Sequence, residues 1–275
     1  MILITGGAGS IGSNLALRLF NYHPKSIRIF DSDENGLVNL KLSIPEKHMN
    51  RYRFFLGDIR DKARIDRAVE DTDYVYHMAA LKHVSIGNYN PFEVIKTNII
   101  GTQNILESVL DAKTVKKFIF FSSDKAADPN NTYGVSKLVG EKLTISATSY
   151  RGDRPTEFCC LRFGNVVGTR GSVWHIWGKQ MKSGKSLTVT DRKMRRFFIT
   201  MSEAIEFIIK ITPVIRGKEI IIPKMKEYSI ESLARSLSSD NIDFTNAVDG
   251  EKVTEHLFAS SEKVEEAEDF WVIRE

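Results

Sequence analysis

The segment Thr5-Gly6-Gly7-Ala8-Gly9-Ser10-Ile11-Gly12 decides the fold class of this chain, because it places three spaced glycines directly after a short apolar run. Gly6 permits a tight turn, Gly9 lets an anionic group approach the backbone, and Gly12 lets a following helix pack closely on the strand. Free amides at the start of that helix would bind the anion. We therefore predict a dinucleotide site here, in preference to a glycine turn without a ligand.

A carboxylate at the end of the second predicted strand extends this site. Asp31 lies nineteen residues after Gly12, where it could accept hydrogen bonds from the adenosine ribose hydroxyls. This favours NAD over NADP, although Arg60 or Lys41 could offset the charge of a 2′-phosphate. Asp58 closes the third predicted strand, where it could hold the adenine amino group or cap a helix.

The first 165 residues alternate between short apolar runs and helical patterns, which indicates a parallel sheet covered on both faces. Strands are expected at Ile2 to Thr5, Ile27 to Asp31, Arg53 to Gly57, Tyr74 to Met78, Lys117 to Ser122 and Glu157 to Arg162. Helices are expected near residues 10–21, 62–70, 91–111 and 132–150. Right-handed crossovers would wind these elements into a Rossmann-type doubly wound parallel sheet.

The fold class is therefore α/β, with a dinucleotide-binding Rossmann domain over residues 1–165. Residues 166–275 show shorter helical and strand patterns, in a more mixed order. We expect them to form a smaller mixed α/β substrate-binding lobe, with some strand exchange between the two lobes. Helices are expected in this lobe near 172–185, 202–211 and 229–238, and strands near 186–190 and 219–223.

The composition is that of an ordinary globular chain of 275 residues, with 39 Lys and Arg against 35 Asp and Glu and 42% hydrophobic residues. A net charge of only +4 gives no electrostatic case for nucleic acid as the main ligand. The apolar runs are far shorter than the ~20 residues that cross a bilayer, and MILIT is a strand pattern, not a signal peptide. The adjacent Cys159 and Cys160 cannot build a disulfide framework, so a cytoplasmic location is expected. No metal site is predicted.

A tyrosine and a lysine four residues apart form the predicted catalytic pair. Tyr133 and Lys137 would share one face of the helix that follows the fifth strand, at the sheet edge where α/β ligands bind. A nearby ammonium stabilises a phenolate, so Tyr133 could act as a base, and Lys137 could also bind the nicotinamide ribose. The alternative is an amphipathic helix with an exposed lysine.

The fifth strand ends in Ser122-Ser123-Asp124-Lys125-Ala126, which brings further polar groups to the same edge. Ser123 could bond the substrate hydroxyl that Tyr133 deprotonates. Hydride transfer alone does not need both Asp124 and Lys125, whereas elimination of water needs one group to remove a proton and another to protonate the leaving hydroxyl. The alternative is an ion pair on a surface loop.

Long stretches of the chain resemble the extended short-chain dehydrogenase/reductases that modify sugar nucleotides. More narrowly, the chain resembles the inverting UDP-N-acetylglucosamine 4,6-dehydratase (5-epimerizing) family of polysaccharide biosynthesis proteins. The resemblance is carried by GGAGSIGS, FDSDE, FLGDIRDKAR, SSDKAADPNNTYGVSK, RFGNVVGTRGSV, LTVTDRKMRRFFITMSEA and GEKVTE. The most discriminating stretch is SSDKAADPNNTYGVSK, because lysine at position 125 distinguishes the inverting family from the related epimerases and the retaining dehydratases.

This resemblance implies a role for each catalytic candidate. Tyr133 would begin oxidation at sugar carbon 4, and Lys137 would tune Tyr133 and hold the cofactor ribose. Lys125 would remove the proton from carbon 5, and Asp124 would protonate the leaving 6-hydroxyl, with the split of acid and base between these two left open. A proton delivered to the opposite face would invert carbon 5.

The resemblance also implies the binding residues and the partners. Those for a tightly bound, recycled NAD or NADP are Gly6, Gly9, Ser10, Ile11, Gly12, Asp31, Asp58, Ile59, Ala79, Ala80, Lys82, Tyr133 and Lys137. Those for a UDP-sugar are Lys82, Asn165, Arg170, Arg196 and Glu251. A homo-oligomer is expected, paired through the helices near 91–111 and 132–150.

Two other functions are weighed against this one. A UDP-hexose 4-epimerase would need Tyr133 and Lys137 but not Lys125. A non-catalytic module that senses a nucleotide sugar or NAD(P) would have no use for all four of Tyr133, Lys137, Asp124 and Lys125 in one cleft.

Overall fold

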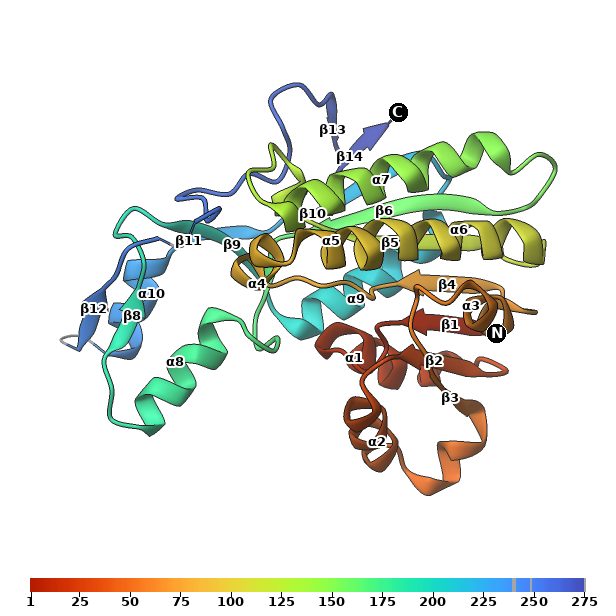
Figure 1. The fold of residues 1–275 in the computed structure, drawn as a ribbon, viewed down its shortest axis with the longest axis horizontal. Helices are drawn as coiled ribbons and strands as arrows, with labels where there is room; N and C mark the ends of the chain where they lie inside the picture. Colours follow the sequence, from red (N-terminus) through yellow and green to blue (C-terminus); the bar gives the residue numbers. More distant parts are fainter. Residues whose placement is uncertain (239–240, 248, 275) are drawn as a thin grey trace.

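The computed structural model describes residues 1–238, 241–247 and 249–274. Among these residues, nine strands form one sheet at the centre of the molecule, in the order β13-β14-β10-β6-β5-β4-β1-β2-β3 (Figure 1). They are β1 (Ile2–Thr5), β2 (Ile27–Asp31), β3 (Tyr52–Leu56), β4 (Tyr74–His77), β5 (Lys117–Ser123), β6 (Glu157–Phe163), β10 (Glu219–Pro223), β13 (Val264–Glu266) and β14 (Phe270–Arg274).

The strands from β3 to β10 run parallel, and β14 and β13 continue the sheet antiparallel beyond β10. The order β3-β2-β1-β4-β5-β6 is that of a dinucleotide-binding Rossmann sheet. β1 is buried along its whole length and β6 along almost all of it, as expected of strands covered on both faces. The predicted Rossmann-type sheet is confirmed.

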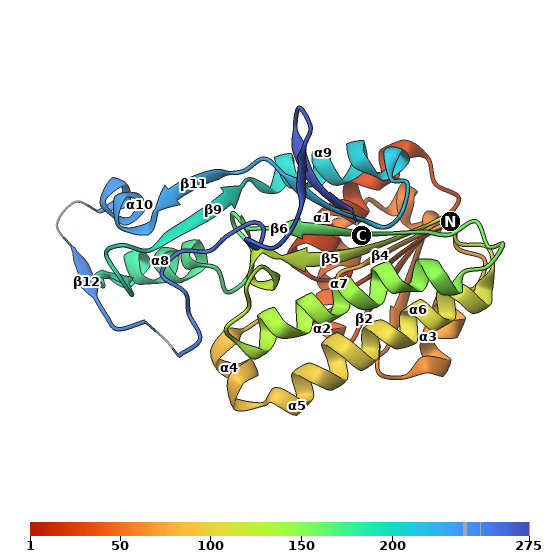
Figure 2. The same cartoon turned by 90° about the horizontal axis from the view of Figure 1, so that it is seen from above.

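Helices cover both faces of this sheet (Figure 2). On one face α3 (Lys62–Val69), α6 (Gly101–Ala112) and α7 (Thr132–Tyr150) pack side by side. On the other face α1 (Ser10–Leu19) packs against α9 (Met201–Ile211). A further helix, α2 (Glu34–Ser43), connects β2 to β3.

A smaller group of elements lies together at one end of the molecule (Figures 1 and 2). It contains the sheet β11-β9-β7, the strand pair β12-β8 and two helices. The elements are β7 (Asn165–Val166), α8 (Val173–Lys182), β8 (Leu187–Val189), β9 (Arg195–Ile199), β11 (Lys226–Ser229), α10 (Ile230–Leu237) and β12 (Ile242–Phe244). They share a separate apolar core around the fully buried Trp177. Since β10, β13 and β14 return to the large sheet, the chain crosses between the two groups after residue 165, and the two-domain division remains a prediction.

The predicted helix over 91–111 is divided in the structure. Short helices α4 (Val84–Tyr89) and α5 (Pro91–Val94) lead into a π-helical segment, Ile95–Ile100, before α6 begins. No helix within the described ranges is long and apolar enough to cross a membrane.

Candidate active site

The turn between β1 and α1 needs glycine at positions 6 and 12, because a side chain at either would clash with the backbone. Gly6 has a φ of +66°, and a Cβ on it would lie 2.6 Å from the backbone nitrogen of Ala79. A Cβ on Gly12 would lie 2.5 Å from the carbonyl oxygen of Gly6. Gly9 stands at the N-cap of α1, and no side chain of the described residues caps that helix. The first amides of α1 are therefore left for an anion at the cleft.

Asp31 ends β2 beside this turn, and its carboxylate is held by the backbone. Oδ2 accepts the amide of Ala8 at 2.9 Å, and Oδ1 accepts the amide of Asp33 at 3.0 Å. Both bonds fix the carboxylate at the wall of the cleft that the glycine turn borders. This is the position that the sequence predicts for a group that binds a ribose.

Asp58 also reaches the cleft, but its carboxylate already has a cation. Arg60 donates to Oδ2 through Nε at 2.9 Å and through Nη2 at 2.5 Å. These bonds lower the pKa of Asp58 below its ordinary value, because they outweigh the opposing effect of burial. The N-cap of α3 is Asp61, which accepts the amide of Arg64 at 3.1 Å, so Asp58 does not cap that helix.

All the residues predicted to bind the cofactor line a single cleft of about 1090 Å³. They are Gly6, Gly9, Ser10, Ile11, Gly12, Asp31, Asp58, Ile59, Ala79, Ala80, Lys82, Tyr133 and Lys137. The uncapped helix start, the amide-bound Asp31 and a cavity of this size fit a dinucleotide. No group of three His, Cys, Asp or Glu side chains is placed to hold a metal ion in the part of the chain that the structure describes.

Tyr133 and Lys137 both come from the first turns of α7. Asn131 caps this helix by accepting the amide of Gly134 at 2.8 Å, which places Tyr133 in the first turn. Lys137 lies one turn further on, where it is buried and donates from Nζ to the carbonyl of Phe121 at 2.6 Å. Burial lowers the pKa of Lys137 to about 8.

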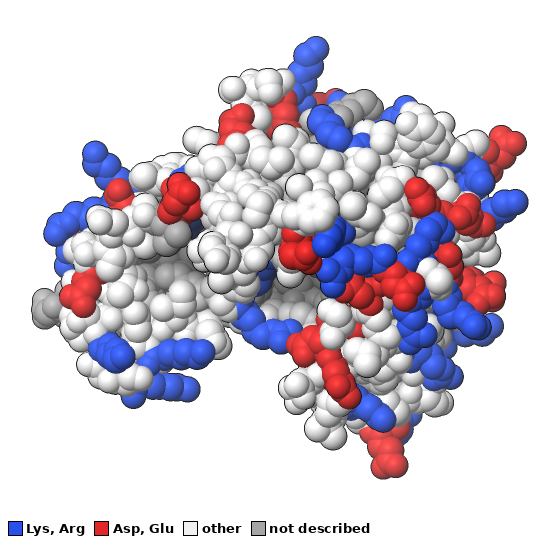
Figure 3. All heavy atoms as spheres, viewed as in Figure 1, with Lys and Arg blue, Asp and Glu red and all other residues white. Residues whose placement is uncertain are grey.

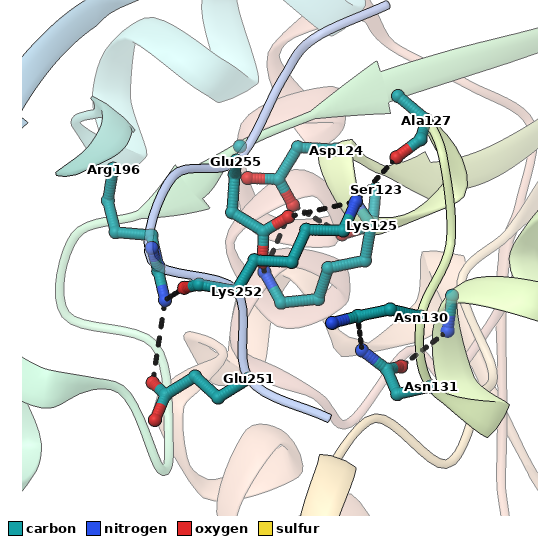
Figure 4. Close-up of polar contacts among 12 residues, drawn as sticks. Ser123, Asp124, Lys125, Ala127, Asn130, Asn131, Arg196, Glu251, Lys252 and Glu255 are labelled. Carbon is teal, nitrogen blue, oxygen red and sulfur yellow. Dashed lines mark hydrogen bonds and ion pairs between the residues drawn. The ribbon is translucent and has the colours of Figure 1, made fainter. Parts of the chain in front are cut away.

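A second lysine, Lys125, lies between two buried carboxylates (Figure 4). Lys125 Nζ is 3.1 Å from Asp124 Oδ1 and 3.2 Å from Glu255 Oε1. Each carboxylate side chain is 1% exposed, and that of Lys125 is 19% exposed and lines the cleft. Ser123 donates from Oγ to Asp124 Oδ1 at 2.9 Å, and Asp124 Oδ2 has no hydrogen-bond partner among the described residues.

The charges in this cluster act on one another. Burial alone would lower the pKa of Lys125, but the carboxylates of Asp124 and Glu255 raise it above the ordinary lysine value. Burial raises the pKa of Tyr133, and the positive charge of Lys125 and a hydrogen bond with Ser123 oppose that rise. Lys125 is therefore an ammonium in the free protein and lies close enough to Tyr133 to stabilise its phenolate.

Glu255 reaches Lys125 on a segment from the C-terminal part of the chain, residues 249–257, which we call the strap. Asn131 Nδ2 donates to the carbonyl of Gly250 at 2.9 Å, and Arg162 Nη1 donates to the carbonyl of Leu257 at 3.0 Å. The strap is thus bonded to the sheet-and-helix part of the molecule on both sides of Glu255.

Arg196 and Glu251, both predicted to bind substrate, lie at the strap and are not among the residues that line the cleft. Arg196 is buried and donates to the carbonyls of Lys252 at 2.7 Å and Val253 at 2.9 Å, and its Nη2 lies 3.5 Å from Glu251 Oε1 (Figure 4). In the structure the guanidinium of Arg196 therefore holds the backbone of the strap. Their role toward substrate remains a prediction.

The other substrate candidates lie at the cleft. Arg170 Nη2 donates to the carbonyl of Ala8 at 2.6 Å, and its amide donates to Ser10 Oγ at 3.0 Å. Lys82 Nζ donates to the carbonyl of Arg170 at 2.7 Å, and burial lowers the pKa of Lys82. Asn165 Nδ2 is buried at the cleft wall and has no hydrogen-bond partner among the described residues. These contacts carry the loop of Arg170 across the glycine turn.

Two residues that were not singled out from the sequence belong to this site. Glu255 is one, and Asn98 in the π-helical segment is the other. Asn98 accepts the amide of Leu81 and donates to its carbonyl, both at 2.8 Å, and also donates to Ser136 of α7 at 2.9 Å. It joins the loop after β4 to the helix that carries Tyr133. An asparagine within a run of Ile and Thr was the only sequence signal for it.

Comparison with known proteins gives one family, described as polysaccharide biosynthesis protein, which matches residues 2–274. An uncharacterised membrane protein of Methanocaldococcus jannaschii is 41% identical over 99% of this chain and 85% of its own length. A UDP-N-acetylglucosamine 4,6-dehydratase (inverting) of Campylobacter jejuni is 41% identical over 86% of this chain and 70% of its own length. A UDP-glucose 4-epimerase of Rickettsia prowazekii is 35% identical over 98% of this chain and 80% of its own length. The crystal structure of Pen from Bacillus thuringiensis superposes with a TM-score of 0.94 at 37% identity, covering 99% of this chain and 87% of that one.

Proposed function

This chain belongs to the polysaccharide biosynthesis protein family, and we propose that it acts there as a UDP-N-acetylglucosamine 4,6-dehydratase that inverts carbon 5. The observation that carries the proposal is the position of Lys125 beside Asp124, next to Tyr133 at one cleft. Oxidation at one carbon needs a single base, whereas elimination of water needs a further base and an acid. The product would be a UDP-4-keto-6-deoxy-L-sugar for glycan biosynthesis.

The cofactor would be NAD or NADP, held by the glycine turn, Asp31 and Asp58, with Lys137 at the nicotinamide ribose. When bound, the cofactor would supply a nicotinamide that can accept a hydride and give it back. The reaction is therefore redox-neutral, and the cofactor would stay bound through turnover. The amide-held carboxylate of Asp31 favours NAD, because a 2′-phosphate would meet its negative charge.

In the first half of the reaction, Tyr133 accepts the proton of the 4-hydroxyl. Ser123 lies beside the phenol and can orient that hydroxyl. The Lys125 ammonium favours the phenolate, since its charge opposes the effect of burial on the pKa of Tyr133.

In the second half, Lys125 removes the proton from carbon 5, and Asp124 protonates the departing 6-hydroxyl. Lys125 begins as an ammonium, so it must first give up a proton. The 3.1 Å contact lets that proton pass to Asp124, which leaves a neutral amine and a carboxylic acid in place for the elimination. One proton is then taken from carbon 5 and one leaves with the water. With hydride returned to carbon 6, a proton from solvent would be delivered to the opposite face of carbon 5 and invert it.

The UDP moiety would be bound by residues around the same cleft. Lys82 and Arg170 would bind the diphosphate, because both are cationic and lie beside the glycine turn. Asn165 would donate to the UDP moiety from Nδ2, which has no hydrogen-bond partner among the described residues. Arg196 of β9 and Glu251 of the strap, which lie 3.5 Å apart, would also contact the UDP moiety.

A UDP-hexose 4-epimerase is the second candidate, supported by the rickettsial relative. Such an enzyme would use Tyr133 and Lys137 in the same way and would make no use of Lys125 as a base. The two functions therefore differ at a single side chain.

Lys125→Ala and Tyr133→Phe test the proposal. In a single turnover with UDP-N-acetylglucosamine, we expect Lys125→Ala still to reduce the bound nicotinamide, seen by its absorbance, while loss of water falls ~10²–10⁴-fold. Tyr133→Phe should abolish nicotinamide reduction itself. Lys47→Ala, an exposed lysine that does not line the cleft, is the control. Dehydration by Lys125→Ala at the parent rate would contradict the proposal and favour the epimerase.

We also propose that the protein is a homo-oligomer that pairs through the face of α4, α5 and α7. This part of the surface is largely uncharged (Figure 3). Large apolar side chains are exposed there, among them Tyr89, Phe92, Ile95 and Val135. Ile95 and Val135 border one shallow hollow, which a second copy would fill.

A further inference from the structure

Glu255 is a buried carboxylate in direct contact with the lysine of the proposed elimination. Its side chain is 1% exposed, and Oε1 lies 3.2 Å from Lys125 Nζ. Oε2 lies 3.8 Å from Lys252 Nζ and accepts no hydrogen bond from the described residues. A buried carboxylate is costly unless it is paired, and Lys125 is its closest cation.

The strap does not depend on Glu255 for its own position. Its backbone is held by Asn131 at Gly250 and by Arg162 at Leu257, and the amide of Arg195 donates to the carbonyl of Val253 at 3.0 Å. Lys252 Nζ makes its hydrogen bond with the carbonyl of Ala127, at 2.8 Å. The strap thus carries Glu255 to Lys125, and the carboxylate itself makes no bond that closes the strap.

The contact between Lys125 and Asp124 alone would leave the ammonium free to turn about one partner. Asp124 is adjacent in the chain, and its Oδ1 is shared with the hydroxyl of Ser123. Glu255 approaches the same ammonium from another segment, so the two carboxylates define the place of Nζ at the cleft (Figure 4). Asp124 and Glu255 both lie within 3.2 Å of Lys125 Nζ, so the place of the ammonium and the path of its proton depend on these carboxylates.

Resting on the dehydratase function proposed above, we propose that Glu255 is a positioning residue that holds Lys125 for the elimination half of the reaction. Glu255 acts through Lys125 and does not line the cleft. The charge of Glu255 also raises the pKa of Tyr133, after the larger effect of burial, so its removal would not disfavour the phenolate. Removing the carboxylate should therefore slow the step that belongs to Lys125 far more than the step that belongs to Tyr133.

The groups that face Lys125 also give the direction of a pH effect. Asp124 and Glu255 raise the pKa of Lys125, burial and the charge of Arg196 lower it, and Tyr133 is close enough to interact with it. Lys252 faces Glu255 from the strap. Loss of the Glu255 charge removes one of the two raising effects, so the pKa of Lys125 falls. The limb of the pH–rate profile that reports Lys125 should then move to lower pH.

Glu255→Gln in the full chain tests this inference, with Glu255→Asp as the conservative variant. For Glu255→Gln we expect dehydration of UDP-N-acetylglucosamine to fall by about 10- to 100-fold, the size seen when a partner that orients a reacting group is lost. Single-turnover nicotinamide reduction should stay within about threefold of the parent, and the Lys125 limb should move down by about 1–3 pH units. Glu255→Asp should recover part of the rate and of the pH profile. Glu266→Gln, which removes an exposed partner of Lys224, is the control.

The outcomes separate this inference from the proposed function. If the parent protein releases no water from the substrate, the proposed function fails whatever Glu255 does. If the parent dehydrates and Glu255→Gln matches it in rate and pH profile, Glu255 is only a structural ion and the inference fails. Equal loss of nicotinamide reduction and dehydration, with unchanged melting temperature and cofactor content, would also overturn it. Should Glu255→Gln not fold, the same three readouts on Glu255→Asp decide, since an unchanged rate and profile there would again refute the inference.

Discussion

Lys137 is a catalytic candidate whose ionisation the fold changes. It is a buried residue of α7, and its pKa is lowered to about 8 from the ordinary 10.5 because burial disfavours its charge. Its ammonium also lies 4.6 Å from the centre of the Phe120 ring. The folded protein therefore loses this proton at a lower pH than the unfolded chain does.

The pH dependence of stability should show this. Between about pH 8 and 10.5 the unfolded chain still binds the proton that folded Lys137 has lost, so the free energy of unfolding rises with pH across this window. Lys137→Met has no such titration. We expect the difference in free energy of unfolding, parent minus variant, to grow by about 3 kcal/mol from pH 8 to 10.5. Urea unfolding at several pH values measures it, with Lys142→Met on the same helix as control. A difference that is constant with pH would refute the lowered pKa.

Single residues differ in how far the sequence could predict them. Local spacing after predicted strands singled out the glycine turn, Asp31 and Tyr133, whereas Lys125 was singled out by the family resemblance of SSDKAADPNNTYGVSK. Their roles remain predictions. Glu255 was not found, because it is 130 residues from Lys125 in the chain and a glutamate in GEKVTE resembles a solvated surface charge. Only the path of the strap brings the two side chains together.

At the scale of elements, a buried arginine joins the C-terminal segment to the sheet. Arg162 in β6 is fully buried, and its guanidinium bonds both carboxylate oxygens of Glu141 in α7, at 2.9 and 2.7 Å. It bonds both carboxylate oxygens of Glu262 at 2.8 and 2.7 Å and also the strap at Leu257. This network fixes the strap from the side opposite Gly250.

Arg162→Met should therefore destabilise the protein strongly. The fully buried Glu141 and the partly buried Glu262 would lose their cation, and breaking a buried ion pair typically costs about 3–5 kcal/mol. A fall in the urea midpoint at constant m-value measures the loss. Arg235→Met, which removes an exposed ion pair with Glu231 on α10, should cost about 1 kcal/mol or less. A loss for Arg162→Met as small as that of the control would show that the network does not hold the strap.

The inner strands of the Rossmann sheet were predictable because each is a short, nearly continuous apolar run that is largely buried. The edge strand β3 is only partly buried but keeps an apolar run, FFL. Two elements show the limits of this signal. α2 was missed because Leu37 and Leu40 are buried whereas Val38 and Leu42 are exposed, which blurs the helical period. The break of the 91–111 helix was missed because it accompanies the tertiary bonds of Asn98 to Leu81 and Ser136, which no local pattern encodes. β13 and β14 pair with distant strands in the same way.

At the scale of the whole molecule, the apolar face of α4, α5 and α7 predicts self-association. We expect the parent protein to sediment as a dimer or larger oligomer at micromolar concentration. Ile95→Glu combined with Val135→Glu should give monomers, because the two charges would be buried between copies without partners. Leu42→Glu, at an exposed position of α2, should leave the assembly unchanged. A parent protein that sediments as a monomer would contradict the proposed pairing.

The most direct test of the proposed reaction is the mass and labelling of its product. The purified protein, without added cofactor, is incubated with UDP-N-acetylglucosamine in heavy water, and the product is examined by mass spectrometry and NMR. We predict a sugar nucleotide that has lost one water and carries solvent deuterium at carbon 5, with the configuration of that carbon inverted. A product of the same mass as the substrate, epimerised at carbon 4 and free of solvent deuterium, would contradict the dehydratase and identify an epimerase.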